Sequence, residues 1–369
     1  MNTDKFYQIA LTMVPNVGDV AAKKLLAYCG SAENVFKESR KSLMSIPGIG
    51  SVIANSILSQ KPFGAAELEL RFIEKNRVMP LFFTDEAYPF RLKQCADAPM
   101  MLFMKGAEAC CLNAKKIISV VGTRSASDYG KAMTETIVKG LSHLDDLLVV
   151  SGLAYGIDVA AHKACLKYDI PTLGVLAHGI DRLYPSMHTQ LSRQMQEAGA
   201  LLTEFRGGTK PERENFPKRN RIISGISDAT LVVEARQKGG ALITADIANS
   251  YNRDVFAVPG RVGDQNSEGC NQLIRRNQAA LVQSARDICY LMAWDAETDK
   301  KAVKPIEQKV DINKEQASVL SVLNQKGKAT ADLLAIHLKL PISKIMHLLF
   351  QLELKGLVKA MAGNQYSKS

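Results

Sequence analysis

The sequence predicts an α/β protein whose centre is a doubly wound parallel sheet, flanked by two smaller, mainly helical domains. Six short apolar segments between residues 117 and 260 alternate with segments of helical periodicity, which is the pattern of parallel strands joined by helical crossovers. Apolar residues also recur at helical spacing in residues 1–108 and 311–369. With 369 residues, the chain is long enough for this division into domains.

The composition is that of an ordinary globular protein with a basic surface. Hydrophobic residues make up 46% of the chain and charged residues 23%, and the formal net charge is +10. Such a charge indicates a polyanionic partner, usually nucleic acid, although it also serves solubility. The N-terminus, MNTDKFYQIALTMVP, lacks the long apolar core of a signal peptide, and no run of about 18 apolar residues predicts a membrane span.

The seven cysteines contain no CxxC pair and no spacing typical of a metal site. An odd, scattered set in a chain of this size is typical of reduced thiols that serve packing. We therefore expect a cytoplasmic protein without a bound metal.

Residues 1–108 are predicted to form a small helical domain with a lead-in segment. Residues 14–18 (VPNVG) and 46–50 (IPGIG) each place a turn before a helix that opens with small residues. Both turns resemble the helix-hairpin-helix element, although Asn16 occupies a glycine position. Such a hairpin presents backbone N–H groups to a nucleic-acid phosphate; the alternative is an interaction domain that keeps the hairpins only as structure. Residues 78–105 are predicted to supply a lead-in strand and a linker.

Residues 109–295 are predicted to form the central, extended Rossmann-like domain. Buried strands are expected at six apolar runs, residues 117–122, 147–152, 171–177, 200–205, 229–235 and 254–260. Helices are expected between them, at residues 129–142, 154–168, 188–199 and 242–252. This alternation predicts right-handed crossovers and helices on both faces of the sheet.

Glycine and arginine residues follow the first strands of the predicted sheet. Gly122, Thr123 and Arg124 come after the first strand, and Ser151 and Gly152 end the second. Because ligands of doubly wound sheets bind beyond the carboxyl ends of the strands, these residues are expected to converge on one edge. Backbone N–H groups of glycine turns and arginine side chains are suited to binding a phosphate.

A second group of such residues lies around the fifth strand. The basic cluster at residues 218–221 (KRNR) precedes it, and the apolar residues on both sides of the cluster predict a loop held against the sheet. After the strand, Gly239 and Gly240 form a turn that opens a helix, whose N-terminus attracts anions. The two groups together predict a phosphate site.

This site does not have the pattern of a standard nucleotide site. GTRSASDYG follows the first strand in place of GxGxxG, no acidic residue ends the second strand, and the chain contains no GxxxxGK[ST] motif. The sequence therefore argues against dinucleotide redox chemistry and against a P-loop ATPase, and it predicts no cofactor.

Residues from about 115 to 290 resemble the DNA-processing protein A family, also called DprA or Smf. The segments that carry the resemblance occur in the family's order and spacing, and they are VVGTRSASDYG, VSGLAYGIDVAAH, GIDRLYP, FPKRNRIISGIS, GGALITADIA, VFAVPG, SEGCN and LIR. They span about half of the chain, and together they are highly specific.

The resemblance implies a homodimeric protein that binds single-stranded DNA without sequence preference. It implies protection of incoming strands during natural transformation and loading of the RecA recombinase on them, with no catalytic residue. The family's phosphate pocket uses the arginine of the first glycine turn and the FPxRNR motif. The expected phosphate-binding residues are Gly122, Thr123, Arg124, Ser151, Gly152, Lys218, Arg219, Asn220, Arg221, Gly239, Gly240 and Thr244.

The chain departs from the family pattern at several positions. The usual Ser-Gly-Ser before LITA is replaced by Gly239, Gly240 and Ala241, which removes two hydroxyl groups. The usual proline pair before Gly-Thr is replaced by Arg206 and Gly207, which adds a cation. These changes leave the expected phosphate pocket intact but remove two of its expected serine contacts.

Four acid–base residues have structural interpretations that compete with catalysis. Asp158 and His162 are four residues apart on one predicted helix, but no nucleophile is near in sequence, which favours a structural hydrogen bond or a helix cap. Glu204 and Glu234 end strands, and we expect them to pair with arginines of the pocket rather than to act as catalysts.

Three further side chains are candidates for the edge of the site. His178 follows a strand and is equally consistent with a pocket position and a structural one. Phe216 and Tyr184 have the aromatic faces on which bases stack. For both rings, however, we expect packing in the core.

An enzyme is the alternative function. The central domain also resembles the lysine-decarboxylase-like nucleoside-monophosphate phosphoribohydrolases, whose signature is PGGxGTxxE. The corresponding turn here is KGGALITAD, with Asp246 in place of glutamate and no preceding proline.

Residues 296–310 are polar and charge-alternating, and they predict a linker. Residues 311–369 hold three amphipathic helical segments and a hairpin pattern around Gly363 and Asn364. This arrangement resembles a winged helix, whose third helix usually reads a DNA groove. Because that helix offers few basic residues, a winged helix that binds protein is the alternative.

Overall fold

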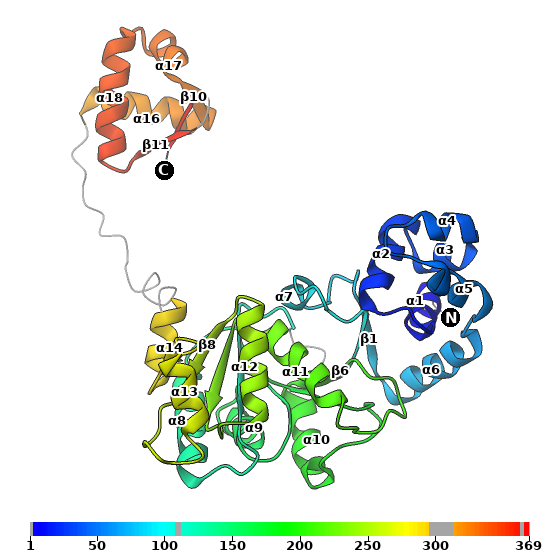
Figure 1. Ribbon diagram of the computed structural model, residues 1–369. Helices are drawn as coiled ribbons and strands as arrows, with labels where there is room; N and C mark the ends of the chain where they lie inside the picture. Colours follow the sequence, from blue (N-terminus) through cyan, green and yellow to red (C-terminus); the bar gives the residue numbers. More distant parts are fainter. Residues whose placement is uncertain (1–2, 108–111, 295–312, 362–364, 369) are drawn as a thin grey trace. The chain divides into compact units, whose positions relative to one another are not determined.

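The computed structural model (Figure 1) describes residues 3–107, 112–294, 313–361 and 365–368. The chain divides into two compact units, Met1–Asp295 and Ala296–Ser369. The predicted α/β class is confirmed, because the first unit joins a helical part to a large, mainly parallel sheet and the second unit is a winged helix. The predicted linker at residues 296–310 and the predicted boundary after residue 108 lie outside the described residues.

Helices form the N-terminal part of the first unit, and they are α1 (Thr3–Met13), α2 (Asp19–Cys29), α3 (Ala32–Lys37), α4 (Arg40–Ser45), α5 (Ser51–Ser59) and α6 (Phe63–Asn76). The two predicted hairpin turns join α1 to α2 and α4 to α5. Asn16 and Gly48 lie in these turns with φ angles of 64° and 84°. Because asparagine tolerates this left-handed conformation better than most residues with a side chain, the first hairpin forms without the expected glycine.

A nine-stranded sheet follows, in the order β1-β2-β6-β5-β4-β3-β7-β8-β9. Its strands are β1 (Met79–Phe82), β2 (Met101–Gly106), β3 (Lys116–Gly122), β4 (Leu147–Ser151), β5 (Thr172–Val175), β6 (Ala200–Thr203), β7 (Ala229–Val233), β8 (Asp254–Ala257) and β9 (Ala280–Leu281). Strands β3 to β9 are parallel, and β1 and β2 form an antiparallel hairpin that pairs with β6. The strand order reverses between β3 and β7, which is where doubly wound sheets bind ligands.

Helices cover both faces of this sheet. The first face packs against α8 (Asp128–Leu141), α9 (Ile157–Lys167) and α14 (Ala285–Met292), with α10 (Thr189–Ala198) beside α9, and the second packs against α11 (Asn215–Ile226), α12 (Gly240–Ser250) and α13 (Glu268–Arg275). In β3, Ile118 and Val120 point to the first layer, and Ile117 and Val121 point to the second. Burial on both faces explains why the strands appear in the sequence as continuous apolar runs. Two short elements, α7 (Phe90–Lys93) and η1 (Ser186–His188), lie in connections.

The predicted strands correspond to β3–β8, and the predicted helices to α8, α9, α10 and α12. One local prediction was wrong, because the basic cluster at residues 218–221 lies within α11 and is not a loop. Another was incomplete, because residues 78–105 supply most of two strands of the sheet where a single lead-in strand was expected. The segment that follows the N-terminal helices therefore belongs to the central sheet, because its strand β2 pairs with β6.

An ion cluster holds the helical part against the edge of the sheet. Arg221 of α11 pairs with Glu204 after β6 and lies 3.5 Å from a carboxylate oxygen of Asp19, the first residue of α2. Asp19 also accepts a hydrogen bond of 2.9 Å from the backbone N–H of Met100. Burial raises the pKa of Glu204 to about 7, although Arg221 acts in the opposite direction. The cluster is therefore an internal connection within the first unit.

The second unit has the winged-helix arrangement. Helices α16 (Lys314–Lys326), α17 (Ala331–Leu338) and α18 (Ile342–Leu354) pack around a core that includes Val319, Leu334 and Leu349. Strands β10 (Lys328–Thr330), β11 (Val358–Met361) and β12 (Gln365–Lys368) form a sheet in the order β10-β12-β11. The pair β11–β12 is the predicted wing, and its predicted turn residues Gly363 and Asn364 lie outside the described residues.

No single helix in the described parts of the chain is both long and apolar enough to cross a membrane. Helices α17 and α18 meet those criteria only as a pair, and they are bent by 114° with respect to each other.

The ion cluster generates a prediction about stability. Replacing Arg221 by Gln leaves the buried Glu204 without its cationic partner, and we expect a loss of about 3 kcal/mol of unfolding free energy. Urea unfolding followed by the fluorescence of Trp294, the single tryptophan, measures this loss, because Trp294 is buried in the core of the first unit. The matched control is Lys218→Gln in the same helix, since Lys218 is exposed and its replacement should change the free energy by less than about 0.5 kcal/mol. Equal values for the two variants would contradict the structural role of Arg221.

Candidate nucleic-acid interface

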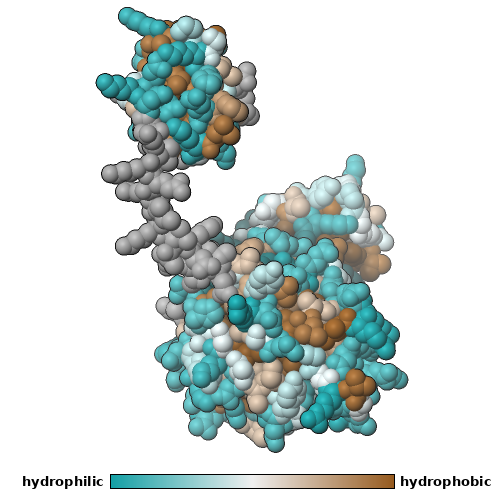
Figure 2. All heavy atoms as spheres, turned by 90° about the vertical axis from the view of Figure 1, so that its left-hand side faces the viewer, coloured by the Kyte–Doolittle hydropathy of each residue, from teal (hydrophilic) through white to brown (hydrophobic). Residues whose placement is uncertain are grey.

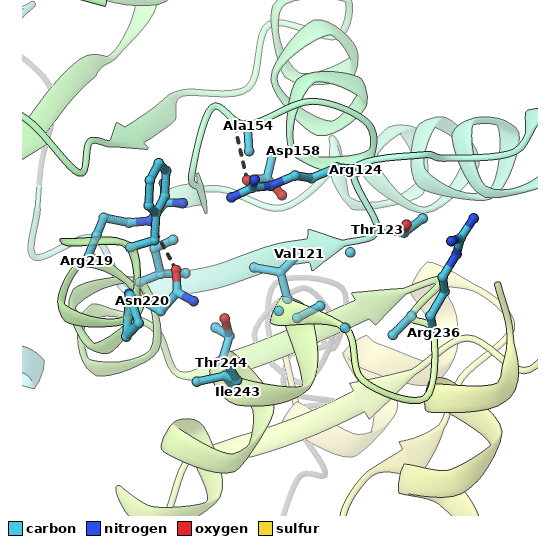
Figure 3. Close-up of a pocket in the computed structure, with 18 of the residues that line it drawn as sticks. Val121, Thr123, Arg124, Ala154, Asp158, Arg219, Asn220, Arg236, Ile243 and Thr244 are labelled. Atoms are coloured by element: carbon cyan, nitrogen blue, oxygen red, sulfur yellow. Dashed lines mark hydrogen bonds between the residues drawn. The ribbon is translucent and has the colours of Figure 1, made fainter. Parts of the chain in front are cut away.

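A large cavity of the first unit lies at the carboxyl ends of β3 and β7, where the strand order reverses (Figure 3). Its volume is about 680 Å³, and it is lined by residues from the turns after both strands, from α11, and from the start of α12. The position is the one expected for the ligand site of a doubly wound sheet. We call it the main cavity.

The turn after β3 forms one wall of the main cavity. Gly122 packs so closely against β7 that a Cβ atom there would lie 2.0 Å from the carbonyl oxygen of Val233, which accounts for the glycine. The next residue, Thr123, donates its backbone N–H to the carbonyl oxygen of Glu234 at 2.8 Å. Arg124 is thereby placed at the rim, where its side chain is exposed and forms no ion pair with any described residue.

One face of α11 forms the opposite wall. Phe216, Arg219, Asn220 and Ile223 line the main cavity, and their spacing of three, four and seven residues is that of one helical face. Pro217 is accommodated because it lies in the first turn, where its missing N–H group has no partner to lose. The helical conformation therefore decides which residues of the FPKRNR segment reach the cavity.

The start of α12 closes the end of the cavity. Gly239 is the N-cap residue and has no side-chain oxygen to bind the first N–H groups of the helix. Gly240 and Thr244 also line this end. The positive end of the helix dipole therefore points into the cavity, which is a favourable place for an anion.

The charge of the lining is strongly positive. Five cationic residues line the main cavity, and they are Arg124, Arg213, Arg219, Arg236 and Lys238. The only carboxylate among the lining residues is that of Asp158 in α9. Burial raises the pKa of Asp158, while the nearby Arg219 acts in the opposite direction. The cavity thus has the electrostatic character of a polyanion site.

Arg219 differs from the other cations because it is almost completely buried. Its Nη1 donates to the carbonyl oxygens of Gly152, at the end of β4, and of Val175, at the end of β5, the latter at 2.7 Å. Burial and the nearby Arg124 lower the pKa of Arg219 to about 10, so the guanidinium remains charged at neutral pH. A Cβ atom at Gly152 would lie 2.2 Å from Nη1, which explains the glycine. Arg219 therefore contributes charge and rigidity more than an open hydrogen-bonding surface.

Two aromatic rings lie beside these cations. The guanidinium of Arg124 lies over the ring of Phe216, with its central carbon 5.2 Å from the ring centroid. Tyr184 packs edge-on against Phe216 at 6.3 Å, lines the same cavity and is 47% exposed. The expectation that both rings are core residues is wrong for Tyr184 and incomplete for Phe216, which is only partly buried.

His178 positions the segment that carries Tyr184. Its Nε2 accepts the backbone N–H of Tyr184 at 3.2 Å, and its Nδ1 lies 2.9 Å from the carbonyl oxygen of Gly179, to which it donates. The imidazole is therefore neutral with its proton on Nδ1. Burial lowers the pKa of His178, which favours this neutral form. The structure thus gives His178 a supporting position behind the wall of the cavity.

The structure brings together eight of the residues expected to bind phosphate. Those that line the main cavity are Gly122, Thr123, Arg124, Arg219, Asn220, Gly239, Gly240 and Thr244. Four others do not line it. Ser151 is buried and donates to the carbonyl oxygen of Val120, Gly152 lies behind Arg219, Lys218 is exposed on another face of α11, and Arg221 faces the ion cluster.

Three cations of the lining were missed by the sequence analysis. Arg236 and Lys238 lie between the end of β7 and the Gly-Gly turn, and Arg213 lies just before α11. For Arg236 and Lys238, the signal was their position after a strand of the parallel sheet, because side chains there reach the ligand edge. Arg213 comes from an irregular segment whose path the sequence does not predict.

Other titratable residues have the structural roles that their burial suggests. His162 is fully buried, its Nδ1 lies 2.7 Å from the Thr172 hydroxyl, and burial lowers its pKa to about 3. Glu204 pairs with Arg221, although outside the main cavity. The expectation that Glu234 pairs with an arginine is wrong, because its carboxylate accepts from the backbone N–H and hydroxyl of Ser127, the N-cap residue of α8. No cluster of three or more potential metal ligands occurs in the described parts of the chain.

The third helix of the winged helix, α18, exposes apolar side chains. Four of them recur at intervals of four residues with exposed fractions of 49%, 47%, 59% and 74%, and they are Ile342, Met346, Phe350 and Leu354. The basic residues expected to meet DNA turn to α16 instead, since Lys344 pairs with Glu315 and Lys355 donates to Gln316 at 3.1 Å. Helix α18 therefore presents an apolar row of side chains, and we take the main cavity of the first unit as the candidate interface.

Comparison with known proteins agrees with this geometry. A sequence model of the family described as DNA recombination-mediator protein A matches residues 79–293, which is more than half of the chain. This chain belongs to that family. Models of the helix-hairpin-helix motif and of the DprA winged helix domain match residues 9–60 and 304–364. The main cavity lies entirely within the part that the family model matches.

Individual relatives cover most of the chain. Protein Smf of Synechocystis sp. is 32% identical over 100% of this chain and 99% of its own length, and DNA processing protein DprA of Streptococcus pneumoniae is 40% identical over 55% of this chain and 71% of its own. The X-ray structure of DprA from Streptococcus pneumoniae superposes with a TM-score of 0.66 at 32% identity, covering 79% of this chain and 98% of that one. DNA processing protein A of Helicobacter pylori, described for its single-stranded DNA binding mode, has a TM-score of 0.53 at 25% identity over 59% of this chain and 97% of its own.

Proposed function

We propose that the main cavity binds single-stranded DNA without sequence preference, and that this binding protects strands taken up during natural transformation. The observation that carries the proposal is the lining itself, in which five cations and the start of a helix surround one buried carboxylate. Phosphate contacts of this kind supply affinity without reading sequence. Membership of a family that includes a single-stranded DNA-binding protein supports the same assignment.

The cations divide into two groups in this proposal. Arg219 is held by strand-end carbonyl groups, so it contributes positive potential from behind the wall. Arg124, Arg236 and Lys238 are exposed and can reach phosphate oxygens directly. Among them, Arg124 has a guanidinium that is already oriented by the ring of Phe216, which reduces the entropy lost on binding. Arg124 is therefore the principal phosphate contact.

The aromatic rings explain a preference for single strands. Unpaired bases expose their faces, whereas bases in a duplex are stacked on their neighbours. Phe216 and Tyr184 border the cavity from different elements and offer such faces next to Arg124. We assign Phe216 the main stacking contact because its ring is close to both arginines of the cavity wall, with the guanidinium carbons of Arg124 and Arg219 at 5.2 and 6.0 Å from its centroid.

The alternative function, phosphoribohydrolase activity, has little support in the geometry. Asp246 takes the place of the glutamate of that signature, but it does not line the main cavity. Asp158, which does, interacts electrostatically with Arg219 and accepts a hydrogen bond from the backbone N–H of Ala154 at 3.3 Å. We therefore propose a binding protein and not an enzyme; release of a free base from nucleoside monophosphates by the purified protein would reverse this choice.

The first prediction of the proposed function concerns the phosphate contact. Arg124→Ala should weaken binding to oligo-dT about tenfold, or about 1.4 kcal/mol, because a hydrogen bond between charged groups is lost. It should also reduce the salt slope by about 0.7, the value for one phosphate on a single strand. Filter binding of oligo-dT and of duplex DNA over a salt series measures both quantities. Arg193→Ala is the control, since Arg193 is exposed on α10 away from the cavity lining.

The stacking contact generates a second prediction with a different signature. Phe216→Leu keeps an apolar side chain but removes the aromatic face, and we expect a loss of about 1–3 kcal/mol in single-strand affinity. The salt slope should stay that of the unmodified protein, and Phe216→Tyr should restore affinity. A loss of affinity in both variants, or a change in salt slope, would show that Phe216 acts through packing alone.

The proposal extends to assembly and partner, for which the family resemblance is the support. We propose a cytoplasmic homodimer that loads the RecA recombinase on the bound strand, and an apolar edge of the first unit supports self-association. Leu281 on the edge strand β9 and Tyr290 and Leu291 on α14 are exposed by 48%, 82% and 49%. The surface on the side of α13 and α14 is otherwise largely hydrophilic (Figure 2).

One experiment tests assembly and loading together. Light scattering should give a mass of about twice that of one chain, and the protein should accelerate RecA ATPase on DNA coated with a single-strand binding protein. Leu291→Glu should lower the mass to that of one chain, because a charge at an apolar interface is costly. A monomeric mass for the unmodified protein, or no acceleration at saturating concentration, would reject the corresponding part of the proposal.

A further inference from the structure

A second hollow adjoins the main cavity on the far side of the Gly-Gly turn. It has a volume of about 390 Å³ and lies between α12 and α13. Lys238, Gly239 and Ile243 line both hollows, so the two are neighbours on either side of this turn. We call the second hollow the α12–α13 groove; apart from Gly239, none of its lining residues is among the expected phosphate-binding residues.

The groove has a different chemistry from the main cavity. Its polar side chains include the amides of Gln272 in α13 and Gln278 after it, which have both donor and acceptor atoms. The carboxylate of Asp246 in α12 also lines it. Its cations are Lys238 at the junction and Arg276 directly after α13. Amide and carboxylate groups match the edges of bases, whereas the two cations match phosphates.

The polar groups of the groove are available to a ligand. Within the part of the chain that the structure describes, the side chains of Lys238, Asp246, Gln272 and Arg276 form no hydrogen bond or ion pair with another residue. The positions of the two sides are fixed, however, because Asn249 of α12 donates to the carbonyl oxygen of Gln278 at 2.9 Å. A preformed hollow with a few polar groups that have no partner in the protein is the usual form of a ligand site.

We propose that the α12–α13 groove is a second subsite that holds the nucleotide adjoining those in the main cavity. Arg276 and Lys238 bind its phosphate, and Asp246 contacts the edge of its base. Its volume is near the lower end of the range of about 300–1,000 Å³ for ligand pockets, which suits one nucleotide. This inference rests on the proposed function, since it extends the path of the same DNA strand.

The subsite discriminates weakly between bases. The Asp246 carboxylate only accepts hydrogen bonds, so it favours a base with an exposed amino group. Cytosine has such a group at N4, whereas thymine has a carbonyl oxygen at the same place. A sequence-independent protein therefore gains a small preference for oligo-dC over oligo-dT from this one position.

Neighbouring arginines offer a matched test of the phosphate contact. Arg275 and Arg276 are adjacent and both exposed, but only Arg276 lines the groove. Binding is measured by fluorescence anisotropy at pH 7.5 with an oligo-dC of about 12 nucleotides. Arg276→Ala should bind about five- to tenfold more weakly than the unmodified protein, whereas Arg275→Ala should stay within about twofold of it. The salt slope should fall by about 0.7 in Arg276→Ala alone. Equal effects of the two variants would overturn the subsite.

The base contact has its own test. Asp246→Asn should abolish most of the difference in affinity between oligo-dC and oligo-dT, because an amide can donate to thymine and accept from cytosine. An unchanged ratio would overturn the base assignment. Arg124→Ala, measured alongside, separates this inference from the proposed function: if it weakens binding while Arg276→Ala does not, the main cavity is the DNA site and the groove is not part of it. If Arg124→Ala has no effect, the proposed function itself fails.

Discussion

The ligand edge of the sheet depends on a single buried cation. The guanidinium of Arg219 is inserted between the carbonyl groups that end β4 and β5, beside the carboxylate of Asp158. A buried charge is costly unless its hydrogen bonds are satisfied, so the strand ends and α11 must keep this geometry. Gly152 belongs to the same constraint, because any side chain there would occupy the place of the guanidinium. The wall of the main cavity is thus fixed before a ligand arrives.

The same constraint separates two kinds of positive charge. A guanidinium that already donates to backbone carbonyl groups has few N–H groups left for a phosphate, but its charge still acts across a medium of low dielectric constant. Arg124, Arg236 and Lys238 are exposed and have donors free for a ligand, although the Nε of Arg236 donates to the side-chain oxygen of Asn266 at 3.3 Å. Their contacts are also the ones that solvent ions screen. The affinity for a polyanion then has two sources. The buried charge of Arg219 supplies a positive potential that salt screens little, and the exposed cations make direct contacts that salt weakens.

The sequence predicted those parts of the fold that depend on local pattern. Continuous apolar runs identified β3 to β8, and the turn after β3 identified Arg124, because both follow from burial on two faces of a parallel sheet. The conformation of residues 218–221 was wrongly predicted, since the apolar residues on both sides of the charged cluster suggested a loop held against the sheet. In the helix that forms instead, Arg219 and Asn220 face the cavity, while Lys218 and Arg221 point elsewhere. The antiparallel pair β1–β2 was also incompletely predicted, because its pairing with β6 joins residues about a hundred positions apart.

Gly239 and Ala241, which stand where the family resemblance leads us to expect serines, alter the start of α12 in a specific way. A serine at the N-cap position usually accepts the N–H of the second or third helical residue with its own hydroxyl group. Gly239 has no such group, so the first N–H groups of α12 have no side-chain acceptor from the cap. A ligand anion then meets no side-chain competitor from the cap, although the backbone N–H of Leu242 already donates to the carbonyl oxygen of Gly239 at 3.1 Å. The lost hydroxyl groups therefore need not weaken an anion site, and the adjacent Lys238 adds charge at the junction with the α12–α13 groove.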